Sequence, residues 1–301
     1  MHRFKKIVIV DKTWLRPWAI RELQKYTEQP IRVFDTPPEN DQEIIERIGE
    51  ADCVLVSKAT FLGESVLKQG KNLKYVGMCC SLYSKASANV DIDSAEQQNI
   101  MVKGIRDYGD EGVVEFIVSE VIRLLKGTGD HQWREEPREL TGQKIGIIGL
   151  GTTGMMVAKI FQNFGSDIYY FSRTRKPSVE NEGICYLPLH ELLQITEIVS
   201  LHLPRNTFLL GHKEFEIFGN GKILINTSVG LTFDHSAFQK WIQGEGNYAI
   251  FDADGIGAYQ AEFSAFNNII SPNKIAGWTM EAQDRLSQKV IANVRDYCAS
   301  H

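Results

Sequence analysis

Three closely spaced glycines constrain the fold of this chain more than any other feature of its sequence. They have the spacing G-x-G-x-x-G and are Gly149, Gly151 and Gly154. The apolar run 145–148 precedes them, and residues 155–164 then place apolar side chains at helical spacing. A second apolar run, 168–171, follows the glycine that ends this stretch. Strand, tight turn, helix and strand, in this order, predict a dinucleotide-binding fold.

The glycine turn predicts a site for the pyrophosphate of a dinucleotide. Gly149 permits the turn, Gly151 lets the backbone approach the phosphates, and Gly154 lets helix and strand pack closely. The helix N-terminus adds N–H groups and a positive dipole end. We therefore predict that the whole turn binds the cofactor, namely Gly149, Leu150, Gly151, Thr152, Thr153 and Gly154. The alternative is a turn that serves helix packing alone.

The end of the second strand indicates which cofactor binds. A site for NAD usually has Asp or Glu there, to bind the ribose 2′-hydroxyl. This chain instead has a basic loop, residues 172–176, with the sequence Ser-Arg-Thr-Arg-Lys. A guanidinium can pair with a 2′-phosphate, and a hydroxyl can donate to it. We predict NADP(H), bound by Ser172, Arg173 and Thr174; the alternative is a solvated basic turn.

Composition limits the remaining possibilities. The 301 residues suffice for two domains, and 43% hydrophobic with 24% charged residues is typical of a globular protein. A net charge of −5 gives no general attraction to nucleic acid or to anionic membranes, and no apolar run approaches the roughly 20 residues of a membrane span. The five cysteines are scattered, without zinc spacing, so we expect no metal and a reducing cytoplasm.

Apolar runs alternate with amphipathic stretches along most of the chain. The first hundred residues show this pattern without a glycine motif of their own, and it resumes after residue 176. Between the two regions, residues 111–126 predict a long helix with Asp110 as its cap. Near-continuous apolar strands that alternate with helices predict two α/β domains, each with a doubly wound parallel sheet.

Several motifs together resemble a known family, the D-isomer-specific 2-hydroxyacid dehydrogenases. This group contains glycerate, phosphoglycerate, formate and glyoxylate/hydroxypyruvate dehydrogenases. The matching stretches are 89–92, 111–116, 147–154, 199–204, 224–228 and 275–279. The sequence Ser172-Arg173-Thr174 is similar to the NADP-using, glyoxylate/hydroxypyruvate reductase-like branch.

The resemblance implies a domain organisation and further cofactor contacts. It implies a Rossmann cofactor domain, 104–284, and a flavodoxin-like substrate domain formed by 1–103 and 285–301. It also implies a homodimer through the cofactor domains and an active site between the domains. The residues expected to line the cofactor are His202, Pro204, Thr227, Ser228 and Asp252, with Asp252 near the nicotinamide carboxamide. The alternative for these residues is ordinary strand-end turns.

The chain departs from the family at its catalytic positions. The family's carboxylate-binding Arg corresponds to Val229, and an alkyl group cannot pair with a carboxylate. The stretch that carries the family's catalytic His here reads Ser-Pro-Asn273-Lys274. The Glu that orients that His corresponds to Gly257, and Glu262 is the nearest carboxylate. The carboxylate-binding loop, 81–87, is altered and longer. All three catalytic side chains are therefore expected to be missing.

Two functions remain open. One is an NADP(H)-dependent reductase of a non-standard carbonyl or imine, in which Lys274 supplies a proton or holds an anion. Ser81, Lys85, Val229 and Asn273 are then the candidate substrate contacts, although Lys274 can equally be an ordinary surface lysine. The other is a catalytically inactive NADP(H)-binding sensor or interaction protein.

Overall fold

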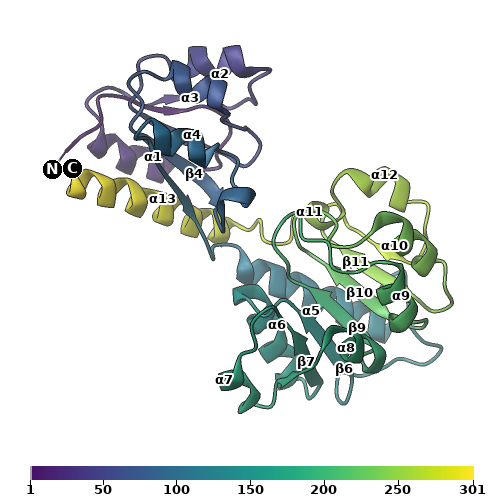
Figure 1. Ribbon diagram of the computed structural model, residues 1–301. Coiled ribbons are helices and arrows are strands. Elements are labelled where there is room, and N and C mark those ends of the chain that lie inside the picture. Colours follow the sequence, from purple (N-terminus) through teal and green to yellow (C-terminus); the bar gives the residue numbers. More distant parts are fainter. Residues whose placement is uncertain (1) are drawn as a thin grey trace. The chain divides into compact units, whose positions relative to one another are not determined.

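The computed structural model describes residues 2–301, which form two compact units. The terminal unit contains the described residues up to Gly109 together with Thr279–His301, and the central unit contains Asp110–Trp278 (Figure 1). These borders lie a few residues from the predicted ones. The assignment of the two units to substrate and cofactor stays a prediction.

The terminal unit is built on a five-stranded parallel sheet with the order β2-β1-β3-β4-β5. Its strands are β1 (Ile7–Ile9), β2 (Arg32–Val33), β3 (Cys53–Val56), β4 (Tyr75–Ser81) and β5 (Met101–Ile105). Apart from the short edge strand β2 and the far edge strand β5, they are almost entirely buried, because helices cover both faces. This strand order is the flavodoxin-like one, which confirms the predicted fold class for this unit.

The helices of the terminal unit form two layers (Figure 1). One face of the sheet packs against α2 (Asp41–Ile48), α3 (Glu64–Gln69) and α4 (Ile92–Gln97). The other lies against α1 (Pro17–Leu23) and α13 (Met280–Ser300), which contact each other. The short helices η1 (Gln24–Tyr26) and η2 (Lys85–Ser87) complete the unit.

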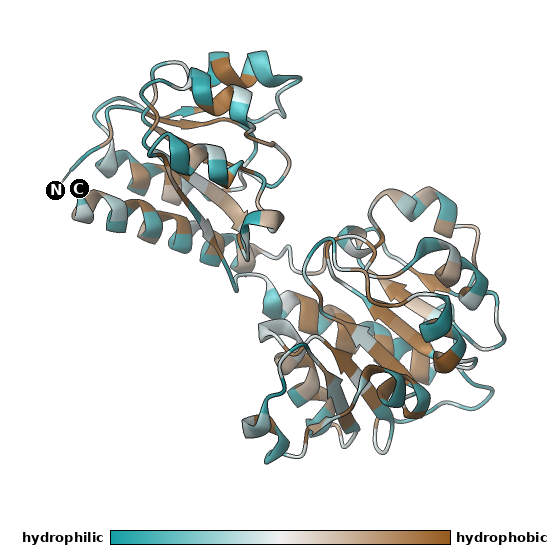
Figure 2. Cartoon of the chain, in the orientation of Figure 1, coloured by the Kyte–Doolittle hydropathy of each residue, from teal (hydrophilic) through white to brown (hydrophobic). Residues whose placement is uncertain are grey.

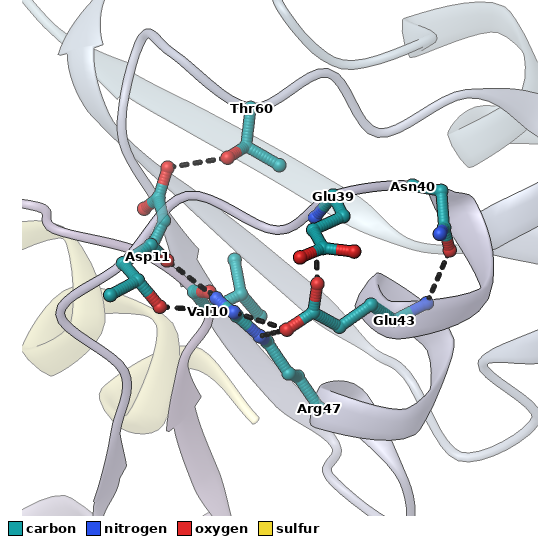
Figure 3. A network of polar contacts seen from close by, with 8 residues as sticks. Val10, Asp11, Glu39, Asn40, Glu43, Arg47 and Thr60 are labelled. Atoms are coloured by element: carbon teal, nitrogen blue, oxygen red, sulfur yellow. Dashed lines mark hydrogen bonds and ion pairs between the residues drawn. The ribbon is translucent and has the colours of Figure 1, made fainter.

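Buried polar side chains tie together the loops at the carboxyl ends of β1, β2 and β3 (Figure 3). The guanidinium of Arg47 donates to the carbonyl oxygens of Val10, at 2.7 Å, and Thr36, at 2.6 Å. The Asp11 carboxylate accepts a 2.6 Å hydrogen bond from the Thr60 hydroxyl. Both charged groups are buried, and Arg47 also pairs with Glu43 while Asp11 also accepts from the Ser57 N–H. The network therefore fixes the loop geometry of this edge.

The central unit has a seven-stranded parallel sheet with the order β12-β11-β10-β9-β6-β7-β8. Its strands are β6 (Lys144–Ile148), β7 (Asp167–Phe171), β8 (Cys185–Tyr186), β9 (Ile198–Leu201), β10 (Ile223–Asn226), β11 (Tyr248–Phe251) and β12 (Ile269–Ile270). The chain runs outward from β6 to β8 and then restarts at β9 on the other side of β6. This order is that of a Rossmann sheet, whose ligands bind at the carboxyl ends beside the strand where the order reverses.

The two faces of the central sheet carry separate apolar clusters. Ile145 and Ile147 of β6 face α5 (Asp110–Lys126) and α6 (Thr152–Asn163), whereas Ile148 belongs to the cluster on the opposite face. The helices of that opposite cluster are α8 (Leu189–Ile195), α9 (His212–Phe218), α10 (His235–Ile242), α11 (Ala253–Ile256) and α12 (Gln260–Phe263). The short helices α7 (Pro177–Glu180) and η3 (Gly257–Tyr259) complete the unit. Figure 2 shows the strands as its most hydrophobic part.

Two local expectations were wrong, and several short elements were not predicted. The helix after the glycine turn begins at Thr152 instead of residue 155, because Gly151 is its N-cap. Strand β8 and helices α7, α11 and α12 were not predicted, since each has too few residues to show a helical or strand periodicity of its own. Asp110 is the first residue of α5 and not its cap.

None of the described helices is both long and apolar enough to cross a membrane.

Candidate functional site

The glycine turn lies at the carboxyl end of β6, where the strand order reverses. Gly149 has a φ of +94°, and a Cβ there would lie 2.1 Å from the carbonyl oxygen of His202. A Cβ at Gly154 would lie 2.1 Å from the carbonyl oxygen of Gly149. Chain packing alone therefore requires glycine at these two positions.

Gly151 differs from the other two glycines. Its φ is −79°, which any residue adopts, and a Cβ built on it meets no atom within 4 Å. It caps the twelve-residue helix α6, whose first-turn N–H groups have no partner inside the helix. The side chain of Thr152 is exposed, and the Thr153 hydroxyl donates to the Asp110 carboxylate of α5. The open space beside Gly151 is thus the part of the turn that a ligand can approach.

The basic loop 172–176 begins where β7 ends. Arg173 is exposed and has no hydrogen-bond or ion-pair partner within residues 2–301. Arg175, in contrast, binds Glu180 through Nε at 2.8 Å and Nη2 at 2.5 Å. The Ser172 hydroxyl donates to the Thr174 carbonyl oxygen at 2.6 Å. Of the two arginines, therefore, only Arg173 is available to an anionic ligand without breaking an internal ion pair.

Lys176 connects the basic loop to the glycine turn. Its ammonium donates to the carbonyl oxygen of Leu150, and its backbone N–H donates to the Tyr170 hydroxyl at 2.6 Å. The two parts of the predicted cofactor site therefore lie side by side. Sequence reasoning included Lys176 in the basic run without giving it a role of its own, and it did not assign Tyr170 or Glu180 to this site. The only signal in the sequence was that Lys176 belongs to the basic run.

His202 follows β9 next to the glycine turn. Its backbone N–H donates to the carbonyl oxygen of Ile148 at 2.8 Å, and its Nε2 lies 2.9 Å from the Ser200 hydroxyl. Burial of the imidazole lowers the pKa of His202 to about 4, although the residue as a whole is partly exposed. The imidazole is therefore neutral near pH 7. Pro204, also predicted to line the cofactor, is exposed.

The loop after β10 is tied to the loop after β9 by Ser228. The Ser228 hydroxyl accepts a hydrogen bond from the Leu203 N–H at 3.0 Å and donates to the Leu201 carbonyl oxygen at 3.2 Å. Its neighbour Thr227 is partly exposed. The Ser228 side chain thus holds two loops of the site together, and its predicted contact with the cofactor stays a prediction.

Asp252 organises the segment that contains Lys274. One carboxylate oxygen accepts from the Gly255 N–H at 2.7 Å, and the other accepts from the Ala276 N–H at 3.0 Å. The N–H of Ala253 donates to the Lys274 carbonyl oxygen at 2.9 Å. The buried carboxylate therefore sets the course of residues 274–276, and its predicted place near a nicotinamide stays a prediction.

The predicted substrate residues of the central unit lie in loops that follow β10 and β12. Val229 is 38% exposed, and Asn273 and Lys274 are also exposed. Asn273 has a left-handed φ of +53°. Lys274 therefore follows a bend and lies in an exposed loop of the central unit.

The predicted substrate residues of the terminal unit differ in availability. Ser81 ends β4 and is partly exposed. The ammonium of Lys85 binds Asp93 at 2.6 Å and Glu96 at 2.7 Å. These bonds raise the pKa of Lys85, that of Asp93 contributing most. Two carboxylates already neutralise this cation, which weakens the case for Lys85 as an anion-binding residue. Residues 2–301 contain no group of His, Cys, Asp and Glu side chains placed to hold a metal ion.

Comparisons with known proteins agree with this geometry. Residues 117–256 match the family described as D-isomer specific 2-hydroxyacid dehydrogenase, NAD binding domain. A hydroxypyruvate reductase of Blautia hydrogenotrophica is 26% identical over 97% of this chain and 96% of its own. A glyoxylate reductase of Thermococcus litoralis is 26% identical over 92% of this chain and 89% of its own. The structure of an acyclic imino acid reductase in complex with NADPH and D-Arg has the same fold, with a TM-score of 0.81, 24% identity and coverage of 98% and 97%.

Proposed function

We propose that the chain is an NADP(H)-dependent oxidoreductase of the D-isomer-specific 2-hydroxyacid dehydrogenase family and that it reduces a carbonyl or imine group. The observation that carries this proposal is Arg173. It is exposed and unpaired within residues 2–301, it follows β7, and its loop is bonded to the glycine turn through Lys176 and Leu150. No carboxylate takes the place that would bind a ribose 2′-hydroxyl.

The residues present fit an NADP(H) molecule. The open space at Gly151 and the first turn of α6 would receive the pyrophosphate, while Arg173 and Thr174 would bind the 2′-phosphate. When bound, the reduced cofactor supplies a hydride. The structural relative that holds NADPH supports this choice of cofactor. His202 is neutral near pH 7, so it would add no positive charge beside a bound nicotinamide.

The substrate side is proposed to differ from that of the family's usual enzymes. Val229 offers an alkyl group where, by the resemblance, a carboxylate would be bound, so a simple 2-oxoacid would lose its main anchor. We propose that Asn273 and Lys274 take part instead, with Lys274 as the proton donor or the anion-binding group. The imino acid reductase among the structural relatives makes imines a class worth testing.

The test is NADPH oxidation by the full-length chain, followed by absorbance, with separate panels of 2-oxoacids, ketones, aldehydes and imines. We expect turnover with a member of the latter three panels and slow turnover of glyoxylate and hydroxypyruvate. Lys274→Ala should lower kcat by about 10²-fold or more if Lys274 donates the proton. Lys213→Ala, at an exposed lysine of α9, is the matched control. Rapid turnover of glyoxylate would contradict the proposed loss of the carboxylate anchor.

A second function rests on the expected absence of the catalytic Arg, Glu and His. The chain would then be an NADP(H)-binding sensor or interaction protein without turnover. Tight NADPH binding without oxidation of NADPH by any panel would favour it. Under either function we propose a homodimer, which light scattering would test, and a cytoplasmic location, with which the five free cysteines agree.

A further inference from the structure

Two side chains, those of Tyr170 and Glu180, hold the basic loop in place through hydrogen bonds. The Tyr170 hydroxyl accepts the Lys176 N–H at 2.6 Å and donates to Glu180 at 3.0 Å. Glu180, in α7, then binds Arg175 through two parallel hydrogen bonds. Tyr170 is fully buried on β7, and its ring packs edge-on against Tyr186 of β8. The loop is therefore anchored to the sheet at Lys176 and to α7 at Arg175.

Of the two arginines of the loop, only Arg175 takes part in these contacts. The guanidinium of Arg175 lies over the Tyr186 ring at 5.3 Å, in addition to its bidentate pairing. Its hydrogen bonds lower the pKa of Glu180, and those of Glu180 raise the pKa of Arg175. Arg175 and Glu180 are therefore both charged at neutral pH, and their opposite charges cancel. Arg173, two residues earlier, has no hydrogen-bond or ion-pair partner among the described residues.

We propose that Tyr170 and Glu180 are positioning residues for the selection of NADP(H) over NAD(H). They hold the basic loop in a conformation that leaves Arg173 as the cation for the 2′-phosphate, while Arg175 serves the structure of the loop. The bond from Lys176 to the Leu150 carbonyl fixes the distance between this loop and the pyrophosphate turn. This inference rests on the proposed function, because it presumes that NADP(H) binds here.

The first experiment measures dissociation constants for NADPH and NADH by titration calorimetry on the full-length chain. Tyr170→Phe removes one hydroxyl and both of its hydrogen bonds. We expect it to raise the Kd for NADPH about 5- to 10-fold, as expected for the loss of about one neutral hydrogen bond, and to change the Kd for NADH less than about 2-fold. NADH lacks the 2′-phosphate, so it reports any general damage to the fold.

Tyr169→Phe is the matched control. Tyr169 precedes Tyr170 on the same strand but packs into the cluster of the opposite face. It should leave both constants near their wild-type values. The inference is overturned if Tyr170→Phe leaves the ratio of the Kd for NADH to the Kd for NADPH unchanged. It is also overturned if Tyr169→Phe weakens NADPH binding as much as Tyr170→Phe does.

A double-mutant cycle tests whether Tyr170 acts through Arg173. Arg173→Ala should raise the Kd for NADPH about 30-fold or more, since a charge-assisted pair is lost. In that background, Tyr170→Phe should add less than about 2-fold, because the group that it positions is gone. A further 5- to 10-fold loss would show that Tyr170 acts otherwise and contradicts the proposal.

The charge-balanced variant Arg175→Ala/Glu180→Gln tests the role of the ion pair. It should raise the Kd for NADPH about 5- to 10-fold, as Tyr170→Phe does, because both variants loosen the same loop. If the Kd for NADPH rises as much as it does in Arg173→Ala, Arg175 is itself a phosphate ligand and the inference is overturned. If the Kd does not change, Glu180 is not a positioning residue. A wild-type chain that binds NADH as tightly as NADPH contradicts the proposed cofactor itself, which separates the two failures.

Discussion

Adding one methyl group at Gly151 should affect cofactor binding much more than it affects the stability of the fold. The backbone of Gly151 is compatible with alanine, and the added Cβ would meet no atom within 4 Å. Alanine is a poorer N-cap than glycine, which costs about 0.5–1 kcal/mol, and the lower entropy of the unfolded chain offsets about 0.4–1 kcal/mol. We therefore expect Gly151→Ala to change the free energy of unfolding by less than about 1 kcal/mol, or about 2–4 °C in Tm.

The effect on cofactor binding should be much larger. If the pyrophosphate lies against Gly151, the methyl group displaces it from the first N–H groups of α6. Loss of two charge-assisted hydrogen bonds, at about 1.5 kcal/mol each, weakens binding by about 3 kcal/mol. That corresponds to a rise of about 100-fold in the Kd for NADPH.

Two glycine variants serve as controls in the same assays, which are thermal unfolding and calorimetric titration with NADPH. Gly63 caps α3 in the terminal unit with a similar φ of −81°, and an added Cβ would lie 3.2 Å from the ring of Phe61, an exposed side chain that can shift. Gly63→Ala should therefore change Tm little and leave NADPH binding unchanged. Gly154→Ala should lower Tm by several degrees, because its Cβ would lie 2.1 Å from a backbone oxygen and overpacking costs about 1–3 kcal/mol. Unchanged NADPH binding by a folded Gly151→Ala chain would refute the placement of the pyrophosphate.

Three further predictions concern the surrounding loops. The folded-state pKa of His202, about 4, lies below its ordinary value of 6.5, so the unfolded chain binds a proton more readily and the free energy of unfolding should fall by about 1–3 kcal/mol as the pH drops from 6.5 to 4. In denaturation measured as a function of pH, His202→Gln should reduce this dependence of the free energy of unfolding on pH. An unchanged dependence would show that other groups cause it. Asp252→Asn should destabilise the central unit by about 1–2 kcal/mol and speed amide exchange at Ala276, whereas unaltered exchange there would remove Asp252 from the ordering of that segment. Val229→Arg should leave Tm within about 2 °C, because the site is exposed, and should strengthen inhibition by oxamate, a 2-oxoacid analogue; no change in inhibition would contradict the assignment of Val229 to the carboxylate position.

The fold was predictable because its signals are local and repeated. Strands such as β3 and β9, with the sequences Cys-Val-Leu-Val and Ile-Val-Ser-Leu, are short apolar runs between helical patterns, and this predicts a doubly covered parallel sheet. Strand β8 could not be found in this way. It has only two residues, and its pairing with β7 is a tertiary contact.

The candidate site was predictable only in part. The glycine turn and the basic loop are each a single short run of the sequence, and the structure places the two runs side by side. The sequence could not show which cation of the loop is free, since that depends on Glu180 and on the buried hydroxyl of Tyr170. Lys85 illustrates the converse case. It was predicted as a substrate contact, but Asp93 and Glu96 of α4 already neutralise its charge.

The most direct measurement of the central claim is a parallel titration of the full-length chain with NADPH and NADH. We predict that NADPH binds at least about tenfold more tightly, and that Arg173→Ala removes this preference by weakening NADPH alone. Equal affinities, or tighter binding of NADH, would contradict the claim that this chain uses NADP(H).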